Sequence, residues 1–307
     1  MLTPNRCGLH ETTRELASGL RARGIDSRLV DPFPEKNPIG FKGTEDRGVP
    51  IADQAWAKTA DVLVSHSGLS KEMDEAQMPF ILVAHGRPRS SFLIESRGGI
   101  PVTSFYARLN TAKRLKNVVT FWPQHYNYLK VLMPDKPVQI VQPSVDLDYW
   151  CPGPKQYDFN GKGGTINIVI SDAWRDDVDP YLPLNAFALW ARTKKGTRAH
   201  LYGRPASAKK GWDALLSRIA ADGNLGEVRG WVNGLREVYR AADAVFTANE
   251  IDVRTVREAM ACGCPVVRIK SDLVVGNIEQ SREQVRAMAE TKFNPSETAR
   301  QFHEVIS

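Results

Sequence analysis

Short apolar segments alternate with stretches of helical periodicity along the whole chain. The apolar segments are rich in β-branched side chains and bounded by turn-forming residues, which is typical of buried parallel strands. Between them, apolar residues recur at helical spacing, as Leu16, Ala17 and Leu20 do before a stop at Gly24. The predicted strands are Ser27–Val30, Asp61–Ser65, Phe80–Ala84, Val118–Trp122, Val138–Val141, Ile166–Ile170, His200–Tyr202, Val228–Val232, Ala244–Thr247 and Val266–Ile269.

Strand–helix alternation of this kind predicts an α/β fold with parallel sheets covered by helices on both faces. The alternation occurs twice, in residues 1–150 and 165–290, on either side of the Pro- and Gly-rich segment 151–164. Such a segment is typical of an interdomain linker. We therefore expect two doubly wound, Rossmann-like domains facing each other across a cleft, with ligands at the carboxyl ends of the strands.

The composition excludes several classes of protein. The chain has 307 residues, of which 42% are hydrophobic and 25% charged, which argues against disorder, collagen-like repeats and coiled coil. No apolar run approaches the roughly 18 residues that span a bilayer, and the first residues lack the apolar core of a secretory signal. No two of the four cysteines have C-x-x-C spacing, so we expect reduced thiols in a cytoplasmic protein.

Positive charge is concentrated in one stretch. The net charge of the chain is +6, and the stretch from Arg87 to Lys116 contains seven basic residues and a single acid, Glu95. A local basic field favours an anionic partner, and the alternative is a solvated face with a basic bias.

The most specific feature is the segment 249–267, in which two glutamates, Glu250 and Glu258, are separated by seven residues. The first is predicted in the loop after a strand and the second one turn into the following helix. Carboxylates bind sugar hydroxyls well, and a helix start attracts phosphate. The alternative is that Glu250 caps the helix while Glu258 is exposed. The sequence that follows Glu258 is Ala-Met-Ala-Cys-Gly-Cys-Pro-Val-Val.

This segment resembles the signature E-x7-E-A-x-A-x-G-x-P-V-V of the retaining glycosyltransferases of family 4, which have the GT-B fold. Weaker matches occur in the same order as in that family. They are Cys7-Gly-Leu-His-Glu, Pro79-Phe-Ile-Leu-Val-Ala-His-Gly, Pro143-Ser-Val-Asp, Val228-Arg-Gly-Trp-Val and Lys292-Phe-Asn-Pro. The last of these resembles the start of the helix that crosses back to the first domain, so the resemblance implies that 291–307 packs on the N-terminal domain.

The resemblance implies metal-independent transfer of a sugar from a nucleoside diphosphate, of UDP or GDP type, without a cofactor. In this family the residues matching His85 and Glu250 lie at the reacting sugar, and the residue matching Glu258 holds the ribose. The remaining donor-binding positions implied by the resemblance are Gly8, Arg175, Gly230, Trp231 and Val232.

The chain also departs from the family pattern. The lysine that usually follows the arginine matching Arg175 is missing, and Arg204 or Arg254 is a candidate to replace it. Ile251 and Val253 stand where the family has glycines. The sequence contains neither a P-loop nor a clean G-x-G-x-x-G, which disfavours ATPase and dehydrogenase functions, and we expect no metal site.

The basic stretch belongs to the domain that receives the acceptor in this fold, and Arg87, Arg89 and Arg97 are its candidate contacts. Basic residues interleaved with aromatics suit a nucleic acid, so one hypothesis is glycosylation of a hydroxymethylated base in DNA, as in phage DNA modification. The equal alternative is a lipid-linked or cell-surface saccharide at an anionic membrane. A GT-B sugar-nucleotide epimerase and a non-catalytic nucleotide-binding module stay open, as does the oligomeric state.

Overall fold

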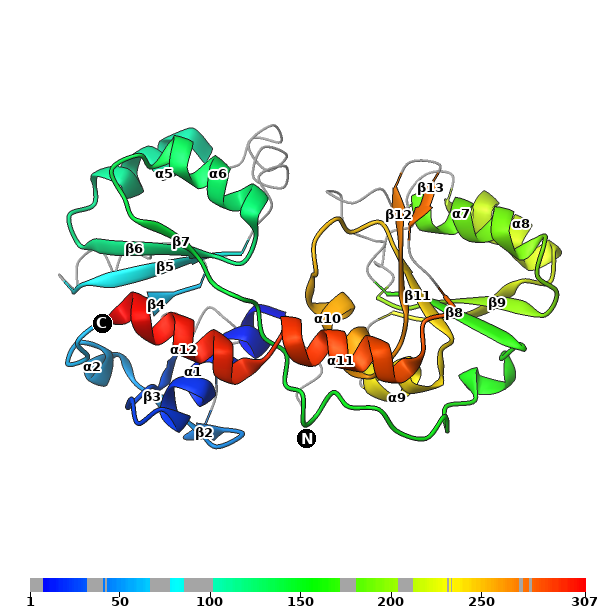
Figure 1. Ribbon diagram of the computed structural model, residues 1–307, viewed down its shortest axis with the longest axis horizontal. Coiled ribbons are helices and arrows are strands. Elements are labelled where there is room, and N and C mark those ends of the chain that lie inside the picture. Colours follow the sequence, from blue (N-terminus) through cyan, green and yellow to red (C-terminus); the bar gives the residue numbers. More distant parts are fainter. Residues whose placement is uncertain are drawn as a thin grey trace. The chain divides into compact units, whose positions relative to one another are not determined.

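The computed structural model describes residues 8–31, 41, 43–66, 78–85, 102–171, 181–203, 212–230, 232, 234–270, 273–275 and 278–307. They form two compact α/β units (Figure 1). The N-terminal unit contains the described residues up to Ser144 together with Phe293–Ser307, and the C-terminal unit contains Val145–Lys292.

The N-terminal unit is built on a parallel sheet with the strand order β4-β5-β6-β7. The side chains of Tyr106 and Leu109 from one helix and Leu129 from another pack on one face of this sheet, against Leu82 and Val118. The strands are β4 (Leu63–Ser65), β5 (Phe80–Ala84), β6 (Leu115–Thr120) and β7 (Val138–Ile140), and the two helices are α5 (Val102–Thr111) and α6 (Pro123–Leu132). A smaller sheet is formed by β1 (Leu29–Val30), β3 (Val49–Ala52) and β2 (Glu45–Asp46), followed by the short helix α2 (Gln54–Ala57).

The last helix of the chain, α12 (Pro295–Ile306), packs against the first described helix, α1 (Gly8–Ala22), as Figure 1 shows. A Cβ at Gly19 would lie 2.8 Å from the Cβ of Ala299, so glycine allows the two helices to approach closely. The hydroxyl of Thr298 donates to the carbonyl of Gln142 at 2.9 Å. The side chain of Asn294 accepts a hydrogen bond from the Ser296 N–H and so caps the start of α12. Residues 293–307 therefore complete the N-terminal unit.

The C-terminal unit contains a sheet with the strand order β10-β9-β8-β11-β12-β13, parallel except for the last pair. Apolar side chains of α7 and α8 pack on one face and those of α9 and α10 on the other. The strands are β8 (Ile166–Ile170), β9 (Thr197–Leu201), β10 (Leu225–Val228), β11 (Ala244–Thr247), β12 (Val266–Lys270) and β13 (Leu273–Val275). The helices are α7 (Leu182–Ala191), α8 (Trp212–Ala221), α9 (Leu235–Ala241), α10 (Arg254–Ala261) and α11 (Arg282–Lys292).

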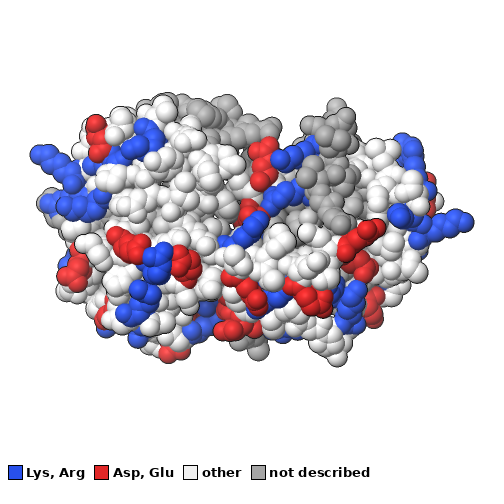
Figure 2. All heavy atoms as spheres, in the orientation of Figure 1, with Lys and Arg blue, Asp and Glu red and all other residues white. Residues whose placement is uncertain are grey.

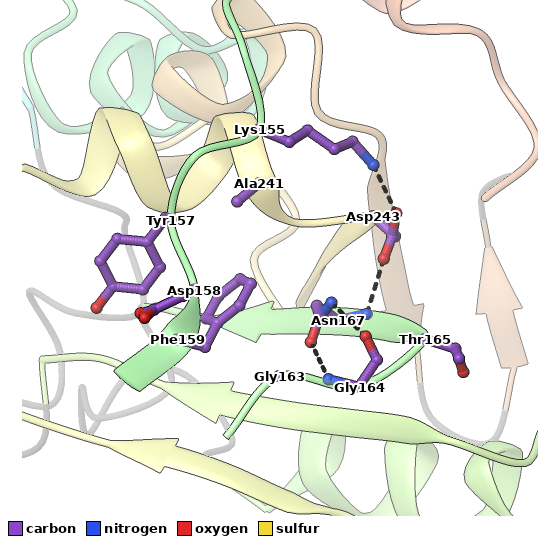
Figure 3. A pocket seen from close by; sticks show the side chains of 10 residues that line it. All are labelled: Lys155, Tyr157, Asp158, Phe159, Gly163, Gly164, Thr165, Asn167, Ala241 and Asp243. Atoms are coloured by element: carbon purple, nitrogen blue, oxygen red, sulfur yellow. Dashed lines mark hydrogen bonds and ion pairs between the residues drawn. The ribbon is translucent and has the colours of Figure 1, made fainter. Parts of the chain in front are cut away.

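The Pro- and Gly-rich segment 151–164 lies within the C-terminal unit, which differs from the interdomain linker that its composition predicts. Polar side chains fasten it to the amino edge of the sheet (Figure 3). The ammonium of Lys155 pairs with Asp243 Oδ1 at 2.9 Å, and Asp243 Oδ2 accepts the N–H of Asn167 at 2.8 Å. The segment and this edge line an open pocket of about 360 Å³, in which Lys155, Asp243 and Asn167 are bonded in series, so we interpret it as part of the packing.

A buried carboxylate, Glu227, anchors the same segment. The side chain is 5% exposed and accepts hydrogen bonds from the hydroxyls of Tyr202 at 2.5 Å and Tyr157 at 2.8 Å. The side-chain amide of Asn160, in the 3-10 helix η1 (Phe159–Gly161), also donates to it. Burial and the bond to this carboxylate raise the pKa of Tyr202, which keeps the phenol neutral and donating.

A buried histidine explains why β10 begins three residues earlier than predicted. The ring of His200 is fully buried, and a Cβ at Gly226 would lie 2.4 Å from its Cε1. The backbone N–H of Glu227 donates to Nδ1 at 3.1 Å, so Nε2 carries the hydrogen and donates to Asn167 Oδ1 at 3.0 Å. The strand thus contains a glycine and an acid at positions where an alternating apolar pattern predicts apolar side chains.

Acid is expected to destabilise the protein through His200. Burial, reinforced by the charge of Arg198, lowers the pKa of this histidine to about 4, whereas the unfolded side chain titrates near 6.5. Between these pH values the unfolded state binds more protons, so the free energy of unfolding falls as the pH is lowered from 6.5 to 4. At about 1.4 kcal/mol per pKa unit, His200 contributes at most ~3 kcal/mol to this loss.

Urea unfolding of wild type and His200→Gln at pH 7 and pH 4.5 measures this contribution. The variant is expected to lose less stability between the two pH values than the wild type. Equal losses in the two proteins would contradict the assignment of the neutral tautomer to His200.

Candidate functional site

The order of the strands in the C-terminal unit marks one position for a ligand. The chain passes from β8 outward through β9 to β10, then returns to the other side of β8 and continues through β11 and β12. The carboxyl ends of β8 and β11 are therefore the switch point at which open α/β sheets bind ligands. The loop after β11 and the start of α10 lie at this point, and they carry the paired glutamates.

The two glutamates occupy different environments. Glu250 is exposed in the loop, and its side chain makes no hydrogen bond to any described residue. Glu258 lies one turn into α10, is 6% exposed and pairs with Arg254, whose Nε is 2.7 Å from Oε1. The N-cap residue of α10 is Val253, which offers no side-chain cap. The alternative in which Glu250 caps the helix and Glu258 is exposed is therefore wrong.

The loop that carries Glu250 is held by an arginine from the neighbouring strand. Arg268 of β12 lies beside Thr247 of β11 in the parallel register. One terminal nitrogen of its guanidinium donates to the carbonyls of Asn249 at 2.5 Å and Ile251 at 3.3 Å. The other terminal nitrogen pairs with the carboxylate of Asp252. The motif gives no role to Arg268, and its only signal in the sequence is an arginine among the apolar residues Val266, Val267 and Ile269.

The other donor-binding candidates are placed in part. Gly230 is exposed just beyond the end of β10, and its carbonyl accepts the N–H of Gly203, after β9, at 2.9 Å. Val232 is half-buried and packs on the core beneath α9. Gly8 is the first residue of α1 in the N-terminal unit. Trp231, Arg175, Arg204, Arg87, Arg89 and Arg97 lie outside the described residues.

Arg254 is bound to protein in this structure. Its guanidinium pairs with Glu258 within the same helix, and its side chain is 12% exposed. Because an arginine one turn before a carboxylate fixes the rotamer of that carboxylate, the pair orients Glu258.

Two histidines meet at the carboxyl edge of the N-terminal sheet. His66 follows β4 and His85 follows β5, and these strands are parallel neighbours. The Nδ1 of His66 lies 2.9 Å from the Nε2 of His85. The ring of Phe121, just after β6, meets His85 edge-on with the centroids 5.3 Å apart. Burial lowers the pKa of His66 to about 4, so this ring is neutral at pH 7.

Most of the described aromatic residues near the basic stretch serve the core. Tyr106 is 7% exposed and packs on the sheet, and Phe121 and Trp122 are also buried. The described basic residues Arg108, Lys113 and Lys116 are exposed. On the face seen in Figure 2, Lys and Arg are interspersed with Asp and Glu among mostly uncharged residues. Packing thus accounts for the aromatic residues of this region that the structure describes.

The thiols and carboxylates show no metal-binding arrangement in the part of the chain that the structure describes. Cys262 and Cys264 are buried beside α10, and burial raises the pKa of Cys264 to about 12. These two thiols are therefore unreactive at neutral pH. Among the described helices, none combines the length and apolar character needed to cross a bilayer.

Comparison with solved structures finds similar chains throughout the length of this one. Anabaena HepE in complex with UDP-glucose is 12% identical and has a TM-score of 0.67, covering 100% of this chain and 97% of its own. WaaG, a glycosyltransferase involved in lipopolysaccharide biosynthesis, is 16% identical with a TM-score of 0.59, covering 98% and 92%. Sucrose-phosphate synthase from Thermosynechococcus elongatus is 13% identical with a TM-score of 0.66, covering 98% and 93%.

Protein-family models and curated protein sequences gave no match to the chain. At 12–16% identity, the structural likeness establishes the fold and not the activity. The predicted fold is confirmed: the chain has the two-unit α/β architecture of the GT-B glycosyltransferases.

Proposed function

We propose that the protein is a glycosyltransferase that moves a sugar from a nucleoside diphosphate to an acceptor hydroxyl. One observation carries the proposal: the acid pair Glu250 and Glu258 lies at the switch point of the C-terminal sheet, with one carboxylate exposed and the other fixed by Arg254. The likeness of the whole chain to the glycosyltransferase WaaG and to HepE, which was solved in complex with UDP-glucose, supports it. UDP-glucose is therefore the first donor to test.

In the proposed reaction the bond between the anomeric carbon and the diphosphate oxygen breaks. The acceptor oxygen forms a bond to that carbon and loses its proton. Negative charge develops on the departing diphosphate, where helix N-termini stabilise it. The first N–H groups of α10 receive no side-chain cap from Val253, so they suit this task. The sequence resemblance supports Arg175 as a second stabilising group and retention of the anomeric configuration.

The two glutamates have separate tasks in the proposal. Glu258, oriented by Arg254, binds the ribose hydroxyls of the nucleotide, and the exposed Glu250 binds a hydroxyl of the transferred sugar. Gly230 and Val232 follow β10 at the same carboxyl edge and contact the base through their backbone. His85 in the N-terminal unit is proposed to contact the reacting sugar, with its Nε2 held by the neutral ring of His66.

For the acceptor we propose a hydroxymethylated base in DNA, which rests on the positive charge of the stretch from Arg87 to Lys116. A base in a duplex must leave the stack to react. Binding of duplex DNA that weakens steeply with salt, together with a mass gain of one sugar on hydroxymethylated DNA, would support this acceptor. Transfer only to a lipid-linked saccharide in anionic vesicles would replace it, and conversion of the donor without any acceptor would indicate an epimerase.

UDP is expected to stabilise the protein against unfolding. A ligand that binds only the folded state at 100 times its Kd raises the free energy of unfolding by about 2.7 kcal/mol. Thermal and urea unfolding with UDP, GDP and UDP-glucose measure this effect. Absence of protection by any nucleoside diphosphate would contradict nucleotide binding in the C-terminal unit.

Glu258→Gln serves as the internal control for this measurement. The amide keeps the shape of the side chain but weakens the bonds to ribose hydroxyls and to Arg254. The variant is expected to need a higher UDP concentration for the same protection. Protection equal to that of the wild type at every concentration would rule out the ribose-binding role of Glu258.

A further inference from the structure

We propose that Arg268 is a positioning residue that fixes the backbone on both sides of Glu250. The inference rests on the proposed function, in which Glu250 binds the transferred sugar, and it adds a residue to which the signature assigns no role. It is carried by the three contacts of one guanidinium with the loop 248–253 between β11 and α10.

The contacts enclose Glu250 along the chain. The carbonyls that Arg268 binds belong to Asn249 and Ile251, the residues immediately before and after Glu250. The third contact is the carboxylate of Asp252. A planar guanidinium with several donors in fixed directions can hold three acceptors at once, whereas an ammonium is a single point of charge. The peptide unit between Asn249 and Glu250 and the one between Ile251 and Asp252 therefore cannot rotate without losing a charge-assisted hydrogen bond.

The strand that carries Arg268 is firmly packed. We call the three contacts of its guanidinium with the loop 248–253 the clamp. Arg268 lies in β12, where the neighbouring residues Val267 and Ile269 are 1% and 2% exposed in the core. Its strand pairs with β11 at Thr247, two residues before the first clamped carbonyl. The hydroxyl of Thr247 in turn accepts the backbone N–H of Asn249 at 3.0 Å. Short polar contacts thus connect the backbone that carries Glu250 to the sheet.

The same contacts leave the guanidinium of Arg268 bound to protein and so argue against a direct role in substrate binding. Both terminal nitrogens of its guanidinium are bound to protein, and the side chain is 23% exposed. The residue therefore acts on the proposed reaction through Glu250. Since a misplacement of about 1 Å costs about 100-fold in rate at a reacting centre, loosening the loop is expected to be visible in turnover.

The test is a double-mutant cycle of Arg268→Lys and Glu250→Gln, with kcat and KM measured for UDP-glucose. Arg268→Lys alone is expected to lower kcat about 10- to 100-fold with little change in KM for the donor. In the Glu250→Gln background the same replacement is expected to lower kcat by less than about threefold, because the carboxylate it positions is already gone.

Arg286→Lys is the matched control. Arg286 lies on α11 in the same unit, and its guanidinium also holds backbone carbonyls, those of Leu147, Trp150 and Ala261. Losing a purely structural guanidinium is expected to lower stability and to leave kcat unchanged. Hydrogen exchange of residues 249–253 is measured in both variants, and faster exchange is expected only in Arg268→Lys.

The outcomes separate this inference from the proposed function. An equal loss of kcat in both Glu250 backgrounds, with a functional wild type, overturns the positioning role and leaves the proposed function standing. A wild type that processes no nucleotide sugar overturns the proposed function. Hydrogen exchange then still tests whether Arg268 restrains residues 249–253. Unchanged exchange of residues 249–253 in Arg268→Lys overturns it in either case.

Discussion

Replacing Glu250 with alanine is expected to lower sugar transfer by about 10²–10³-fold, the loss found when one oriented polar contact to a transition state is removed. The side chain is exposed and makes no hydrogen bond to the described residues, so we expect it to contribute little to stability. The urea unfolding curve of Glu250→Ala should therefore coincide with that of the wild type. Initial rates with saturating UDP-glucose, together with the two unfolding curves, measure both halves of the prediction.

Glu283→Ala is the control for Glu250→Ala. Glu283 is an exposed glutamate in the first turn of α11, in the same unit but away from the loop after β11. Its replacement removes the same charge and should leave the rate unchanged. Wild-type turnover by Glu250→Ala would remove Glu250 from the reaction, and an equal loss in both variants would indicate an effect of net charge.

Replacing Glu227 with alanine is expected to destabilise the C-terminal unit by about 2–4 kcal/mol, because it leaves a buried hydroxyl without its acceptor and opens a cavity. The change deprives the Tyr202 hydroxyl of its 2.5 Å acceptor, leaves a cavity and releases Tyr157 and Asn160. It also removes the 3.1 Å ion pair with Arg229. Urea unfolding followed by tryptophan fluorescence measures the loss.

Tyr157→Phe calibrates this measurement. It removes one hydroxyl donor to Glu227 but keeps the ring that meets Phe159 edge-on, with centroids 5.0 Å apart. The expected loss is about 1 kcal/mol, the net value of one hydrogen bond. If Glu227→Ala costs no more than Tyr157→Phe, the carboxylate does not hold the segment 151–164 to the sheet.

The sequence predicts the elements best where local pattern and tertiary environment agree. β5, β8 and β11 have the predicted bounds, because each is a continuous apolar segment between clear stop signals. β10 was misplaced because Gly226 and Glu227 serve contacts with His200 and with the tyrosines, which are distant in sequence. The edge strands β2 and β13, of two and three residues, are too short for a periodicity to show.

The candidate site was predictable only as far as local spacing reaches. The seven-residue interval between Glu250 and Glu258 correctly places one in a loop and the other one turn into a helix. The pairing of His66 with His85 depends on the register of two strands, which spacing does not give. The contact of Arg268 with the loop likewise depends on β11 and β12 being neighbours. Contacts between side chains on neighbouring strands therefore cannot be predicted from the sequence until the order of the strands in the sheet is known.

The packing of α12 on α1 has a consequence for the order in which the protein matures on the ribosome. The apolar face of α1 emerges early, but the helix that covers it is synthesised only after the complete C-terminal unit. The apolar face of α1 therefore stays uncovered until α12 has been synthesised. The C-terminal unit, in contrast, is one continuous segment, Val145–Lys292, and can fold as soon as that segment has left the ribosome. Transiently exposed apolar surface of this kind is expected to make the partly synthesised chain prone to aggregation.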